Sequence, residues 1–142
     1  MIAAIARHVS IVAGLSGSLA AAVPGFLLWQ RLSRSAFAGP FVRYYLLEMA
    51  LIGAAVFVTI LARAAAAAPA AWAACGVTGA FVFAAGATIG TLYLPASGLF
   101  ALSAVLAHVA ARRQRIFHLV LGAGAAAVQL GLMAAVAAIG SS

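Results

Sequence analysis

Long apolar runs separated by short polar stretches make up almost the whole chain. The runs cover residues 9–29, 41–62, 72–93, 95–111 and 116–139. A helix that crosses a membrane needs about 20 mostly apolar residues, because each residue adds about 1.5 Å and the hydrocarbon core is about 30 Å thick. The pattern therefore predicts an all-α integral membrane protein, with five transmembrane helices bundled in a single domain over residues 1–142.

The composition excludes a water-soluble fold of this size. Of the 142 residues, 68% are hydrophobic and 6% are charged, and the mean hydropathy is +1.23, whereas soluble domains carry about 25% charged residues. A domain this small buries only about 70% of its surface, so the remaining apolar surface must face lipid or other helices. The first run stays apolar through residues 26–29, beyond the small residues 20–22, so we expect a retained helix and not a cleaved signal.

The fourth run is the shortest, and it leaves one alternative open. Counted from Leu94, it forms a helix about 27 Å long, which is just enough to cross a membrane. In the alternative, four helices span the membrane and this segment is re-entrant, so that it dips in and returns. Because the run carries no charge that would keep it out of lipid, we favour five spans.

The charged residues bear on the orientation of the chain. All eight basic residues are arginines, Glu48 is the only acid, and the net charge is +7. The arginines lie at the ends of apolar runs, where they anchor helices at lipid headgroups, and are not gathered on a solvated face as in a nucleic-acid-binding protein. Five spans place five arginines on the side of the N-terminus and three on the other side, which predicts a cytoplasmic N-terminus, whereas four spans would divide them six to two. The two sets in the five-span arrangement are Arg7, Arg63, Arg112, Arg113 and Arg115, and Arg31, Arg34 and Arg43.

One stretch bears on the cellular location. The run GTLYLPASGLFALSAVLA over residues 90–107, followed by an arginine pair, resembles in composition stretches of small membrane proteins from GC-rich bacteria. The resemblance implies a bacterial inner membrane and implies no activity.

Glu48 is a candidate functional residue because it lies inside a predicted span. It is roughly 10 Å from the start of its helix, and an ionisable side chain at that depth is costly. Tyr44 lies one turn earlier and can donate a hydrogen bond, while Arg43 or Arg34 could neutralise the carboxylate. One interpretation is a structural pair, and the other is a proton or cation relay. The chain has no second acid to continue a relay or to build a carboxylate metal site.

The three histidines are candidate cofactor ligands. Five spans place His8, His108 and His118 at the same face of the membrane, and neutral imidazole binds haem iron or chlorophyll magnesium. Two histidines on adjacent antiparallel helices could bracket a tetrapyrrole. Because His8 and His118 lie close to arginines at the interface, His108 is the position at which we would expect a haem, a chlorophyll or a quinone. The sequence requires no cofactor and predicts no metal site.

Two further polar features have a structural and a functional interpretation. Arg112, Arg113 and Arg115 form a basic cluster that can anchor the chain at an anionic leaflet, at about 1 kcal/mol per charge, or bind a lipid phosphate or an acidic patch on a partner. Gln129 lies midway along the fifth run, where its amide needs a hydrogen-bonding partner. That partner could be a quinone oxygen or a neighbouring helix, and we expect the helix.

Small residues recur at helical spacing on three of the runs. Helices in lipid associate by close packing, which small residues allow. Each stripe can therefore pack inside the bundle or form an interface with a partner subunit. The stripes are Gly14, Ser18 and Ala22 on the first run, Gly86 and Gly90 on the third, and Ala123, Ala127, Gly131 and Ala135 on the fifth.

The motifs of common enzyme classes are absent from the sequence. It contains no CxxC, CxxCH, HExxH or Walker A motif, so we predict that the protein is not an enzyme. The first functional expectation is a small accessory or structural subunit of a larger membrane complex, with other membrane subunits and lipids as its partners. The alternatives are a haem-, quinone- or chlorophyll-binding anchor that uses His108, and a small proton or solute transporter that relies on Glu48.

Overall fold

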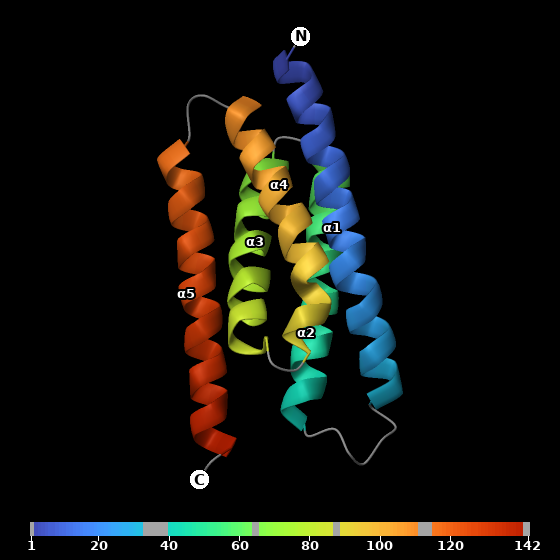
Figure 1. Cartoon of the computed structure of the whole chain (residues 1–142), viewed down its shortest axis with the longest axis vertical. Helices are drawn as coiled ribbons and strands as arrows, with labels where there is room; N and C mark the ends of the chain where they lie inside the picture. The colour runs from blue at the N-terminus through green and yellow to red at the C-terminus, as the bar shows by residue number, and fades with distance from the viewer. Residues whose placement is uncertain (1, 33–39, 64–65, 87–88, 111–114, 141–142) are drawn as a thin grey trace.

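Five α-helices form the described part of the chain, which comprises residues 2–32, 40–63, 66–86, 89–110 and 115–140 of a computed structural model (Figure 1). The helices are α1 (Ile2–Leu32), α2 (Pro40–Ala62), α3 (Ala67–Ala84), α4 (Leu94–Ala110) and α5 (Arg115–Gly140), with a short 3₁₀ helix, η2 (Gly90–Tyr93), directly before α4. All five are long and apolar enough to cross a membrane, and the described residues contain no strand. The five-helix prediction is confirmed, and the fold fits a multi-pass membrane protein.

The third helix differs most from its predicted bounds. It begins at Ala67 and ends at Ala84, whereas the apolar run suggested residues 72–93. Pro69 falls in its first turn, where a missing backbone N–H breaks no helical hydrogen bond, so the alanines before Trp72 extend the helix. At the other end, the residues up to Tyr93 belong to η2 and lead into the next helix.

The short helix η2 lengthens the fourth apolar segment enough for it to cross a membrane. η2 continues directly into α4, and together they give an apolar segment of 20 residues from Gly90 to Val109. α4 then runs from one end of the bundle to the other without turning back (Figure 1). The re-entrant alternative is therefore not the fold of this segment.

The helices form a bundle with α1 and α5 at opposite edges (Figure 1). α1 packs along both α2 and α4, and α3 packs along α4 and α5 and more briefly along α2. α5 rests mainly on α3, and only 11% of its most apolar stretch is buried, compared with 33% for α1, α2 and α3. α5 is therefore the helix that its own bundle covers least.

Serine side chains tie α1 to α4. The Ser10 hydroxyl donates to the backbone oxygen of Ser103 at 2.8 Å, and the Ser103 hydroxyl donates to the backbone oxygen of Ser10 at 2.7 Å. Both residues are buried. Because hydrocarbon offers no alternative partner, each hydroxyl satisfies its hydrogen-bonding need on the opposite helix.

Aromatic residues lie in the centre of the bundle, and large apolar residues also cover its outside. Phe81 and Tyr93 are fully buried and meet edge to face, with ring centroids 5.4 Å apart. Large apolar side chains such as Val12, Leu61 and Phe83 are exposed. In water such a surface would be unstable, but in a membrane it faces lipid tails.

Candidate functional site

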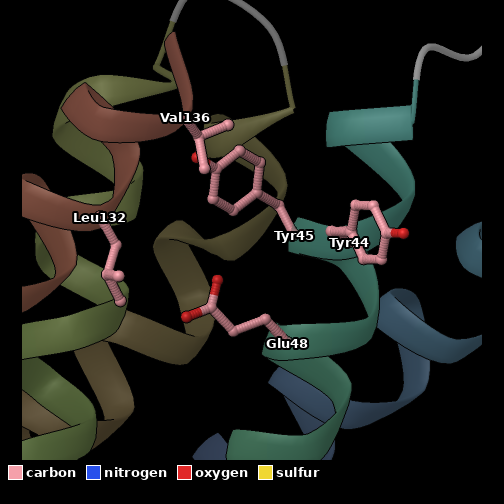
Figure 2. A pocket seen from close by; sticks show the side chains of 5 residues that line it. All are labelled: Tyr44, Tyr45, Glu48, Leu132 and Val136. Atoms are coloured by element: carbon pink, nitrogen blue, oxygen red, sulfur yellow. The ribbon is translucent and has the colours of Figure 1, made fainter. Parts of the chain in front are cut away.

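The Glu48 carboxylate lies between α2 and α5. It is about 12 Å along the axis from the start of α2, and its side chain is half-buried. Figure 2 shows the carboxylate directed from α2 into the space beside Leu132 of α5. The only acid of the chain is thus placed between two helices of the bundle.

Gln129 of α5 is a hydrogen-bond partner of Glu48. Its amide nitrogen Nε2 donates to Oε2 of the carboxylate at 3.2 Å, and the Gln129 side chain is only 2% exposed. An amide at mid-membrane depth needs such a partner, because the surrounding hydrocarbon accepts no hydrogen bond. The prediction that Gln129 contacts a neighbouring helix is confirmed.

Tyr44 does not play the part that its spacing predicts. It lies one turn before Glu48, but its side chain is 70% exposed and Figure 2 shows its hydroxyl pointing away from the carboxylate. The tyrosine is turned outward, whereas Gln129 reaches the carboxylate from α5. The predicted hydrogen bond from Tyr44 is therefore replaced by one from Gln129.

A cleft of about 370 Å³ opens beside the carboxylate. Apart from the carboxylate, its walls are aliphatic or aromatic. Tyr45 contributes its ring, which also packs on Phe81 with centroids 5.8 Å apart. The residues that line the cleft are Tyr44, Tyr45, Glu48, Leu132 and Val136 (Figure 2). The site thus combines one acid with apolar walls, in a volume within the range of about 300–1,000 Å³ that is typical of small-molecule sites.

His108 lies near the end of α4 and contacts Trp72 of α3. The two rings meet at 64° with centroids 6.2 Å apart. His118, near the start of α5, is 3% exposed, whereas the imidazole of His8 bonds to the Ala4 backbone oxygen of its own helix at 2.8 Å. No group of three His, Cys, Asp or Glu side chains within the described residues could hold a metal. A tetrapyrrole or quinone at His108 stays a prediction.

The small residues of α1 pack within the bundle. A Cβ atom on Gly14 would lie 2.7 Å from Ile60 of α2 and 3.0 Å from Ser103 of α4. A Cβ atom on Gly53 of α2 would lie 2.6 Å from the backbone oxygen of Ser18 and 2.7 Å from the backbone nitrogen of Ala22. The stripe of Gly14, Ser18 and Ala22 therefore lets α1 approach its neighbours closely.

The glycine pair predicted on the third helix is not on a helix face. α3 ends at Ala84, so Gly86 and Gly90 both lie beyond it. The Gly90 backbone nitrogen donates to the Ala85 backbone oxygen at 2.9 Å, and a Cβ atom on Gly90 would collide with that residue. Gly86 and Gly90 thus follow the end of α3, where Gly90 lies close against Ala85. The uninterrupted apolar run gave no sign that the helix ends at Ala84.

The small residues of α5 are the ones left open. Ala123, Ala127, Gly131 and Ala135 are all exposed, and nothing lies within 4 Å of a Cβ atom built on Gly131. Arg112 and Arg113 lie outside the described residues. Arg115 is the first residue of α5.

Sequence reasoning missed the closest helix contact, which joins α3 and α5. A Cβ atom on Gly76 would collide with the Gly122 backbone oxygen and lie 3.1 Å from the Ala126 backbone nitrogen. The two glycines thus bring the backbones together and fix the position of α5. Single glycines within two separate apolar runs carry no spacing signal that would pair them.

No protein-family model, curated protein or solved structure matches the chain, so its function must be argued from this geometry alone.

Proposed function

We propose that the protein is a small membrane transporter that binds a cationic solute in the cleft between α2 and α5, with Glu48 holding the positive charge. The observation that carries the proposal is the position of Glu48, whose carboxylate extends from α2 into the cleft and meets Gln129 of α5. An intramembrane acid is costly and is typically retained for a function. A bound cation would neutralise it and offset part of that cost.

The chemistry of the cleft favours an organic cation with an apolar body. A bare metal ion prefers several oxygen ligands, whereas this cleft offers one carboxylate among apolar side chains. Leu132 and Val136 suit an aliphatic or aromatic body, and the Tyr45 ring can attract a cation through its face. An ammonium group attached to a ring or chain matches all of these features.

The position of α5 at the edge of the bundle (Figure 1) supports movement of the solute as well as binding. α5 rests mainly on α3, and the hydrogen bond from Gln129 ties it to α2. We propose that a cation at Glu48 weakens this hydrogen bond, which loosens the tie between α2 and α5 and allows the cleft to change shape.

The proposal is tested by flux of benzyltrimethylammonium, a permanently charged ammonium with an aromatic body, into proteoliposomes. We expect flux with the natural protein, and we expect Glu48→Gln to reduce it to the level of protein-free liposomes. Thr59→Val is the matched control on α2, because Thr59 bonds only to its own helix, at the Ala55 oxygen. Equal flux with the natural protein and Glu48→Gln would overturn the proposal.

A second function, favoured by a different observation, is that of an accessory subunit of a larger complex in a bacterial inner membrane, with the N-terminus in the cytoplasm. It is supported by the open stripe of small residues on α5, because such faces pack against other helices in membranes. Native electrophoresis of extracts in mild detergent tests it. We expect a complex that Gly131→Leu dissociates. A single free species for the natural protein would contradict this function.

A further inference from the structure

Three aromatic ring nitrogens from three helices are buried without a hydrogen-bond partner in the described part of the chain. They are Nε1 of Trp72 on α3, Nδ1 of His108 on α4 and Nδ1 of His118 on α5. We call these three residues the nitrogen cluster. Most buried polar groups in folded proteins have a partner, and leaving one without costs free energy, so three at one end of a small bundle require an explanation.

The contacts of Trp72 bring the cluster together. The His108 ring meets the Trp72 ring with centroids 6.2 Å apart. On the α5 side, a Cβ atom on Gly122 would lie 3.1 Å from the Trp72 backbone oxygen and 3.2 Å from its ring atom Cε3. His118 precedes Gly122 by one turn, on the same face of α5. Trp72 thus contacts His108 of α4 on one side and, on the other, approaches α5 one turn from His118.

The local electrostatics favour a negatively charged ligand. α3 and α5 pack side by side and both begin at this end of the bundle (Figure 1). Helix N-termini carry partial positive charge and free N–H groups, whereas α4, which carries His108, ends here with the opposite partial charge (Figure 1). Neither helix has an acidic residue in its first turn, and Ala66 offers no side-chain cap to α3.

We propose that the nitrogen cluster binds a phosphate group, supplied by the headgroup of an anionic phospholipid. The indole N–H can only donate, and an imidazole Nδ1 donates when it carries the proton, so a ligand with several acceptor oxygens can satisfy all three nitrogens. Trp72 and His118 lie about 5–8 Å along their helices from the helix starts. The cluster therefore lies within two turns of the end of the bundle, the end nearest the phospholipid headgroups of one leaflet. Trp72 and His108 are half-buried, so part of each side chain reaches the surface of the bundle, while the three nitrogen atoms themselves are buried.

Native mass spectrometry of the full chain, with phosphatidylglycerol added in neutral detergent, tests this proposal. We expect the natural protein to retain this lipid, and we expect Trp72→Phe and His118→Leu each to weaken retention by about tenfold, which is the effect of losing a hydrogen bond to a charged group. His8→Phe is the matched histidine control, because His8 bonds within α1. Diacylglycerol, which lacks the phosphate, should not be retained.

Tryptophan fluorescence and competition by inorganic phosphate test the site in two further ways. In a Trp29→Phe background Trp72 is the only tryptophan, and its emission should shift with phosphatidylglycerol and not with diacylglycerol, whatever the stability of the other variants. Release of the lipid by millimolar inorganic phosphate would assign the cluster to a free phosphate compound and overturn the lipid source. Equal retention of diacylglycerol, unchanged retention in both cluster variants, or a Soret band lost in His108→Phe would overturn the phosphate site.

Discussion

Gln129 of α5 donates a hydrogen bond to Glu48 of α2 at 3.2 Å, and this bond links two helices that otherwise have little contact. It joins the only acid of the chain to a buried amide midway along α5. The pair therefore has two consequences. It attaches the most loosely packed helix to the bundle, and it holds the carboxylate at the edge of the cleft.

Replacing Gln129 with leucine should destabilise the fold. The change removes the hydrogen bond and leaves the carboxylate without that donor, at a cost of about 1–3 kcal/mol. Thermal unfolding in detergent measures the loss. Val128→Leu, on the exposed side of the same helix, should leave the midpoint unchanged. Equal midpoints for Gln129→Leu and the natural protein would show that the bond does not hold α5.

Replacing Gly76 with alanine should separate α5 from α3. The new methyl group would collide with the Gly122 backbone, and overpacking of this kind costs about 1–3 kcal/mol. Limited proteolysis and thermal unfolding report the change. Gly124→Ala is the control, because nothing lies within 4 Å of a Cβ atom there. Equal unfolding temperatures for Gly76→Ala and Gly124→Ala would contradict the close contact between α3 and α5.

The serine pair between α1 and α4 should show energetic coupling. Ser10→Ala and Ser103→Ala each remove one hydroxyl of a reciprocal pair, so a double-mutant cycle should give a coupling of about 1 kcal/mol. Unfolding by a denaturing detergent supplies the free energies. Ser16→Ala, at an exposed position of α1, serves as the control. Strict additivity of the two changes would contradict the reciprocal hydrogen bonds.

Five crossings place the two ends of the chain on opposite sides of the membrane. Figure 1 shows the N-terminal end of α1 and the C-terminal end of α5 at opposite ends of the bundle. A protease-protection assay with a tag at either terminus should therefore find one tag protected and one cleaved in sealed vesicles. Protection of both tags, or cleavage of both, would require an even number of crossings.

The sequence predicted the fold more completely than the site, for physical reasons. In lipid, an apolar run of spanning length satisfies its backbone hydrogen bonds by forming a helix. The number of runs in the sequence therefore predicted the number of helices. The ends of α3 could not be predicted in the same way, because alanine and glycine are apolar whether or not they belong to a helix. Glu48 and Gln129 each stood out as a polar residue in an apolar run. Their pairing depends on the rotation and register of α5 against α2. The packing of α5 on α3 at Gly76 and Gly122 contributes to that placement, and no local pattern encodes it.

The central claim is that Glu48 holds the charge of a cation in the cleft between α2 and α5, and direct binding of benzyltrimethylammonium to the purified protein tests it. Isothermal titration in neutral detergent should give saturable binding to the natural protein and to Thr59→Val. Glu48→Gln keeps the shape of the side chain and removes its charge, so its affinity should fall by about tenfold or more. Equal affinity in the natural protein and Glu48→Gln, or no binding to either, would contradict the account.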